Sequence, residues 1–255
     1  MVVGLDKFKE YFRDFPGSYV IIGGTACDII IGASGLTPRV TKDIDIILII
    51  EALKPEFVSH FWSFIKDGGY EKREKSAEER KYYRFLKPAN PGYPYQVELF
   101  SRKPDILDLE GEPHLTAIPV DDDLSSLSAI LLNEEYYRFT IDHSILEDNL
   151  HRANTEALIC LKAKAFLDMQ ARKEKGEKVD ERHIRKHKAD VFRLVLFLAP
   201  ENVFELPGSL KVDMHTFVES VKDNLPAPAI FKEMGAENID AIVLLDQLVK
   251  NFNLK

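Results

Sequence analysis

The spacing of hydrophobic residues in the first half of the chain changes repeatedly between a helical and a strand period. Apolar side chains three and four residues apart are typical of helices with one buried face, and short β-branched runs are typical of buried strands. The run over residues 44–50 is the strongest strand signal. We predict helices at 5–14, 25–31 and 54–67, and strands at 19–22, 44–50, 82–86, 95–100, 127–132 and 136–141.

The second half of the chain has a helical period throughout. We predict helices at 155–173, 181–199, 212–223 and 228–252. A mixed half followed by a helical half predicts an α+β fold with two domains. We place the domains at residues 1–150 and 151–255.

Composition narrows the classes of function. The net charge of −8 disfavours duplex DNA as a partner, because proteins that bind duplex phosphates are usually basic. Cys27 and Cys160 stand among apolar residues, which predicts buried free thiols in a reducing compartment. The first residues lack the pattern of a signal peptide, and Asp45 interrupts the longest apolar run. We therefore expect a soluble cytoplasmic protein without a membrane partner.

The first candidate for chemistry is a pair of glycines, Gly23 and Gly24, between the strand at 19–22 and the following helix. Glycines at such a turn let the backbone approach a ligand closely, and the start of the helix favours an anion. Thr25 adds a hydroxyl at the same place. The alternative is a tight turn that needs glycine only for steric reasons.

Three acidic residues are the second candidate. Asp43 and Asp45 are two apart at the start of a strand, so both carboxylates leave the same face. Their mutual repulsion calls for a cation, and hard oxygen ligands suit Mg²⁺. Glu98 on a later strand could complete a two-metal site or accept a proton from an attacking hydroxyl. The alternative for all three is a solvated strand face.

The order of these elements resembles that of the DNA polymerase β-like nucleotidyltransferases. In that superfamily a strand, a Gly-Gly turn and a helix precede an Asp-x-Asp strand and a later acidic strand. The runs from Ile22 to Ala26 and from Arg39 to Asp45 more specifically resemble the AbiEii family of nucleotidyltransferase toxins. This family is known from abortive-infection and type IV toxin–antitoxin systems.

The resemblance also covers two later segments. The first is the run around Lys162, with Lys164 as the alternative match for the family's lysine, and the second surrounds Asp190. It implies a nucleotidyltransferase core, completed by a helical domain, with the active site in the cleft between them. The implied substrate-binding residues are Gly23, Gly24, Thr25, Arg39, Thr41, Lys42 and Lys164, and the implied catalytic residues are Asp43, Asp45, Glu98, Lys162 and Asp190.

The implied reaction is transfer of an NMP from an NTP to an acceptor hydroxyl with release of pyrophosphate. Two Mg²⁺ ions, or Mn²⁺ in their place, would be held by Asp43, Asp45 and Glu98. The acceptor would be an RNA, such as the 3′ end of a tRNA, and the basic stretch 162–193 could meet its phosphates. A cognate antitoxin is the expected protein partner. The alternatives are a protein nucleotidylyltransferase and a non-catalytic module that binds NTP.

Overall fold

The computed structural model describes residues 2–39, 41–76, 82–100, 116–118, 130–131 and 133–254. The chain folds into two compact units. The first consists of residues 1–28, 40–120 and 144–153, and the second of residues 29–39, 121–143 and 154–255. The chain last passes from the first unit to the second between Ala153 and Asn154.

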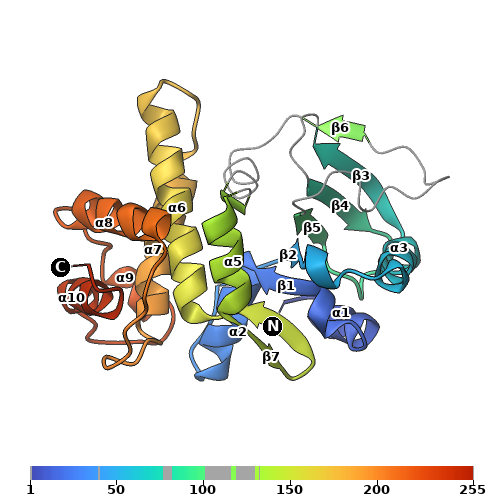
Figure 1. Ribbon diagram of the computed structural model, residues 1–255, viewed down its shortest axis with the longest axis horizontal. Coiled ribbons are helices and arrows are strands. Elements are labelled where there is room, and N and C mark those ends of the chain that lie inside the picture. Colours follow the sequence, from blue (N-terminus) through green and yellow to red (C-terminus); the bar gives the residue numbers. More distant parts are fainter. Residues whose placement is uncertain are drawn as a thin grey trace. The chain divides into compact units, whose positions relative to one another are not determined.

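The first unit is built around a mixed β-sheet, drawn from blue to yellow-green in Figure 1. In the described part of the chain the sheet has eight strands in the order β6-β3-β4-β5-β2-β1-β8-β7. Strand β2 lies between β1, its antiparallel partner, and β5, its parallel partner. The strands are β1 (Tyr19–Ile22), β2 (Asp43–Leu48), β3 (Tyr70–Ser76), β4 (Tyr82–Pro88), β5 (Gln96–Phe100), β6 (Thr116–Ile118), β7 (Ser144–Glu147) and β8 (Leu150–Ala153).

Helices α1 (Leu5–Phe12) and α3 (Pro55–Gly68) pack beside this sheet through aromatic side chains. Phe12 of α1 contacts Phe57, Phe61 and Phe64 of α3, and Phe61 also contacts Phe85 of β4. These rings are fully or almost fully buried, and each adds apolar area to the core. Short 3₁₀ turns, η1 (Pro16–Ser18) and η2 (Ile50–Ala52), flank β1 and β2. Helix α2 (Gly23–Ala33) follows β1 directly.

The second unit is helical and centres on α6 (Thr155–Glu174), which contacts three other helices. Eleven residues of α6 are buried, so this helix has a much wider buried surface than one amphipathic stripe. The other helices of the unit are α5 (Glu134–Asp142), α7 (Glu181–Val195), α8 (Gly208–Val221), α9 (Ala229–Lys232) and α10 (Ala241–Asn251). Among the described residues, none of the helices combines the length and the apolar character needed to cross a lipid bilayer.

The structure confirms the α+β class and most of the predicted elements, but the strand predicted at 136–141 is wrong. These residues belong to α5. The side chain of Asn133 accepts hydrogen bonds from the backbone N–H groups of Glu135 and Tyr136, which satisfies the start of a helix. Tyr136 and Thr140, four residues apart, are both buried, so the aromatic and β-branched residues that suggested a strand line the inner face of this helix.

The strand predicted at 127–132 is also wrong at the two residues of that range that the structure describes. Residues 130–131 are helical, and the other residues of that range lie outside the described part of the chain. The helix predicted at 228–252 is divided into α9 and α10. Asp240 starts α10 by accepting a hydrogen bond from the backbone N–H of Ile242. Strands β3, β6, β7 and β8 were not predicted from the sequence.

Candidate functional site

The glycine turn and the aspartate strand are packed directly against each other in the first unit. Gly23 has a φ of +67°, the left-handed region that favours glycine. A methyl group on its α-carbon would lie 1.7 Å from Oδ2 of Asp45. The absent side chain of Gly23 therefore makes room for the Asp45 carboxylate, and the pairing of Ile22 with Asp45 fixes this register.

Two further contacts hold the same region together. The fully buried Thr25 hydroxyl donates a 2.5 Å hydrogen bond to the backbone carbonyl of Asp43. A side chain on Gly24 would lie 2.8 Å from Oγ1 of Thr41. That Thr41 oxygen is buried and has no hydrogen-bond partner among the described residues. The Thr25 hydrogen bond thus connects the start of α2 to β2. The missing side chain of Gly24 leaves room for the Thr41 side chain, whose hydroxyl has no hydrogen-bond partner among the described residues.

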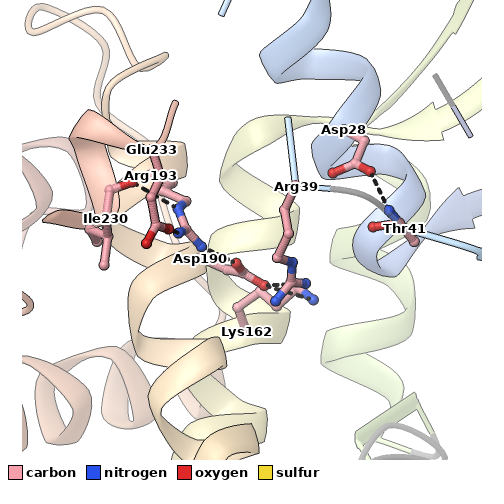
Figure 2. A network of polar contacts seen from close by, with 8 residues as sticks. All are labelled: Asp28, Arg39, Thr41, Lys162, Asp190, Arg193, Ile230 and Glu233. Atoms are coloured by element: carbon pink, nitrogen blue, oxygen red, sulfur yellow. Dashed lines mark hydrogen bonds and ion pairs between the residues drawn. The ribbon is translucent and has the colours of Figure 1, made fainter. Parts of the chain in front are cut away.

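Asp28 was missed by the sequence analysis, although it holds the segment that leads into β2. Its Oδ2 accepts a 3.1 Å hydrogen bond from the backbone N–H of Thr41, as Figure 2 shows. Asp28 follows Gly24 by one helical turn, so both residues face the same segment. The next residue, Lys42, is exposed, and its ammonium group lies 6.0 Å from the centre of the Tyr95 ring. The spacing of four residues between Gly24 and Asp28 is the sequence feature that could have indicated the role of Asp28.

The two aspartates and Glu98 lie on one face of adjacent strands. Asp43 and Asp45 are half-buried, whereas Ile44 between them is fully buried, as expected from the alternation of a strand. Asp45 is the register partner of Glu98 on β5. Register partners in neighbouring strands point to the same face of the sheet, so this pair brings two carboxylates from separate parts of the sequence together.

Glu98 is buried and already has two donors. Its Oε1 accepts a hydrogen bond from Nε of Arg84 at 2.9 Å and another from Nε2 of Gln96 at 2.6 Å. Within the described ranges, no group of three or more His, Cys, Asp or Glu side chains is arranged to hold a metal ion. The role of Glu98 as a third metal ligand therefore stays a prediction. Arg84 could not be identified from the sequence, because it becomes a neighbour of Glu98 only through the pairing of β4 with β5.

In the second unit, Asp190 on α7 is the centre of a cluster of cations. Lys162 on α6 is buried, and its Nζ lies 3.5 Å from Oδ2 of Asp190. A guanidinium nitrogen of Arg39 lies 3.6 Å from the same oxygen. The resemblance implies catalytic roles for both Lys162 and Asp190, and the two side chains form an ion pair. Their role in transfer stays a prediction.

Electrostatics keep Asp190 ionised in this environment. Burial by itself raises the pKa of a carboxyl group, but the positive charges of Lys162 and Arg39 outweigh it and lower the pKa of Asp190 below its ordinary value. His187 and Lys186 act in the same direction. Asp190 is thus a buried anion at neutral pH, stabilised by the cations around it.

Lys164, the alternative lysine, lies in a different environment. Its ammonium group donates a 2.9 Å hydrogen bond to Asp213 on α8, and a third of its side chain is exposed. The hydroxyl of Tyr136 donates to the other oxygen of Asp213. Lys164 therefore has a local partner in its own helical packing, whereas Lys162 is buried beside a carboxylate that it shares with Arg39.

Comparison with solved structures finds distant likenesses in fold. No family model and no curated protein matches the sequence. A solved structure titled as an antigenic nucleotidyltransferase-like protein from Paracoccidioides brasiliensis is similar to this chain with a TM-score of 0.40 and 13% sequence identity. The match covers 89% of this chain and 97% of that one. The functional argument therefore rests on the residues themselves.

Proposed function

We propose that the protein is a metal-dependent nucleotidyltransferase that passes an NMP from an NTP to an acceptor hydroxyl. The observation that carries this proposal is the packing of the Asp45 carboxylate onto the bare α-carbon of Gly23. This contact joins a helix start that favours phosphate to a pair of carboxylates that favours a divalent cation. A turn that needed glycine only for its backbone angle would have no requirement for a carboxylate in that space.

The aspartate pair fits a divalent cation in its chemistry. Asp43 and Asp45 place two hard oxygen ligands on one half-buried strand face, and oxygen ligands of this kind suit a divalent cation. They would hold Mg²⁺, or Mn²⁺ in its place, with phosphate oxygens and water completing the coordination. When bound, the metal would supply neutralisation of phosphate charge. A second ion held with the help of Glu98 belongs to the same proposal.

The chain's own groups would then bind and orient the triphosphate. The backbone N–H groups at the start of α2 would donate to phosphate oxygens, and the missing side chain of Gly24 leaves room for Thr41 beside them. The unsatisfied hydroxyl of Thr41 is a further donor beside Gly24. Holding the nucleotide in one orientation for attack on its α-phosphate would supply a large part of the rate enhancement.

Lys162 and Arg39 are proposed to neutralise the phosphates further. Both face a single oxygen of Asp190, which brings two cationic side chains together. Cationic side chains held close together suit the charge of a polyphosphate.

For the acceptor we propose an RNA, such as a tRNA 3′ end, and for the biological role a toxin of a toxin–antitoxin or phage-defence system. Support comes from the resemblance to AbiEii-like toxins and from exposed basic residues on α6, the linker and α7, including Lys175, Lys178 and Arg185. Transfer to a Ser, Thr or Tyr hydroxyl of a protein would use the same site. A module that binds NTP without catalysis is the second alternative.

One labelling experiment separates these functions. The protein is incubated with each α-³²P-labelled NTP and Mg²⁺, together with total RNA or total protein of a bacterial lysate. We expect label in the RNA fraction, and none with an Asp45→Asn variant. Label in protein alone would replace the RNA acceptor by a protein acceptor. NTP binding without label in either fraction would leave only the binding module.

A further inference from the structure

Arg193 on α7 connects the Asp190 cluster to a part of the chain in which the sequence showed no motif. Its guanidinium group is buried and donates a 3.3 Å hydrogen bond to Oδ1 of Asp190. Its other end contacts the region of α9, where it donates to Glu233 at 3.1 Å and to the carbonyl of Ile230 at 3.4 Å. Figure 2 shows the chain of contacts from Glu233 through Arg193 to Asp190.

The two oxygens of Asp190 have separate partners. Oδ1 accepts the hydrogen bond from Arg193, and Oδ2 faces both Lys162 and Arg39. A guanidinium group is planar and rigid. A hydrogen bond from Arg193 to Oδ1 therefore restrains the rotation of the Asp190 carboxylate about its Cβ–Cγ bond. The orientation of Asp190 therefore sets which oxygen is presented to the two proposed phosphate-binding cations.

The same short segment also holds the residues that precede Arg39. The backbone N–H of Thr37 donates a 2.9 Å hydrogen bond to the carbonyl of Met234. Residues 230–234 thus contact Arg193 at two points and the chain beside Arg39 at a third. We call residues 230–234 the clamp segment.

The ion pair between Arg193 and Glu233 affects the balance of charge around Asp190. Arg193 has an acidic partner of its own in Glu233, whose side chain is 69% exposed. Glu233 therefore offsets part of the positive charge that Arg193 brings to Asp190. Without Glu233, the full charge of Arg193 would act on a buried carboxylate that Lys162 and Arg39 also face.

We propose that Arg193 is a positioning residue and that the clamp segment, through Arg193 and Thr37, fixes the geometry of Lys162 and Arg39 around Asp190. This inference rests on the proposed function for its consequence in catalysis. It assigns a role in the active site to part of the last fifty residues. It predicts that a change on the exposed Glu233 alters turnover of NTP although Glu233 itself contacts no substrate.

The test uses charge reversal at one exposed position with a matched control. Glu233→Lys places a cation beside Arg193, and Glu237→Lys makes the same change four residues later at an exposed position. Both variants are made in the full chain, alone and combined with Arg193→Ala. The measurements are kcat and KM for NTP, the melting temperature, and hydrogen exchange of peptides that cover residues 34–39.

We expect Glu233→Lys to lower kcat/KM about fivefold, the upper range for loss of an exposed ion pair, while the melting temperature stays close to that of Glu237→Lys. In the Arg193→Ala background, Glu233→Lys should have no further effect, because its influence passes through Arg193. Arg193→Lys should restore part of the activity that Arg193→Ala loses. Equal effects of Glu233→Lys and Glu237→Lys, or equal effects of Glu233→Lys in both backgrounds, would overturn the proposal.

Hydrogen exchange separates this proposal from the proposed function. If the wild-type protein transfers no nucleotide, the clamp is judged by exchange alone. Faster exchange at residues 34–39 in Arg193→Ala and Glu233→Lys, with unchanged exchange in Glu237→Lys, supports the clamp. Unchanged exchange in all three variants contradicts it, whatever the activity of the protein.

Discussion

The glycine–aspartate region of the first unit and the Asp190 cluster of the second unit are built on different physical principles. In the first, close packing leaves no room for change: a bare α-carbon at Gly23 accommodates the Asp45 carboxylate, and Thr25 binds the Asp43 backbone. In the second, long charged side chains meet at distances of 3.3–3.6 Å around one carboxylate. Steric fit fixes the first region, whereas a balance of charges holds the second.

This difference predicts how each region responds to substitution. A packed site should fail abruptly when one atom group is added, because the neighbouring backbone cannot move away. A charge cluster should respond to pH and to remote charges, and its members should be strongly coupled to one another. Each prediction below tests one side of this comparison.

The largest effect is expected for Gly23→Ala. The new methyl group would overlap Oδ2 of Asp45 at a φ of +67°, so we expect the unfolding free energy to fall by about 3 kcal/mol. We expect transfer activity to be lost with it. Gly32→Ala is the control, since Gly32 lies in the same helix and its added methyl group would contact nothing within 4 Å. Denaturant titration that found equal stability for the two variants would contradict the steric account.

Next in size are the effects of Lys162→Ala and Asp190→Ala. Each should lower activity about 100-fold, a typical loss when one group that stabilises transition-state charge is removed. The double variant should lose much less than the sum of the two free energies, because the residues form one ion pair. Single-turnover kinetics of all four proteins give the coupling. Strictly additive losses would mean that Lys162 acts without Asp190.

A smaller effect is expected from pH. The pKa of Asp190 is lowered in the folded protein, so its ionised form contributes stability above the ordinary carboxyl pKa of about 4 and loses it as pH falls through the lower folded value. The difference in unfolding free energy between the wild type and Asp190→Asn should therefore be larger at pH 7 than at pH 3. Urea titrations at the two pH values measure it, and a difference that grew toward acid would reverse the assignment.

The smallest effect is expected for Lys164→Ala. Lys164 is a third exposed and pairs with Asp213, so its loss should cost less than about 1 kcal/mol of stability. Activity should fall far less than in Lys162→Ala, by about the twofold to fivefold change that this energy allows. Steady-state kinetics decide between the two lysines. A larger loss for Lys164→Ala than for Lys162→Ala would transfer the phosphate-binding role to Lys164.

The two regions also differ in how far the sequence could reveal them. Gly23, Gly24, Asp43 and Asp45 are visible because each glycine and each strand aspartate is locally unusual, and the strand period places both carboxylates on one face. A strand was predicted where α5 lies, because the aromatic residues of α5 suit a strand equally well. The hydrogen bond that Asn133 accepts at the start of α5 favours the helix.

Contacts between segments that are distant along the chain could not be predicted from the sequence. Arg84 meets Glu98 only through the pairing of two strands, and Arg193 meets Glu233 across forty residues. A charged residue in a helix carries no sign of its partner, since a solvated face and a buried ion pair have the same composition. Asp190 and Lys162 could be named from resemblance, but the cations that share Asp190 depended on the fold.

The central claim is that Asp43 and Asp45 together support nucleotidyl transfer, and isosteric variants test it most directly. Asp43→Asn and Asp45→Asn keep the size of each side chain and remove one negative charge each. Release of labelled pyrophosphate from γ-³²P-NTP is measured with Mg²⁺ and RNA for the wild type and both variants. The account predicts release by the wild type and at least a ~100-fold lower rate in each variant, with unchanged melting temperatures. Rates above a tenth of the wild-type rate in a folded variant would contradict it.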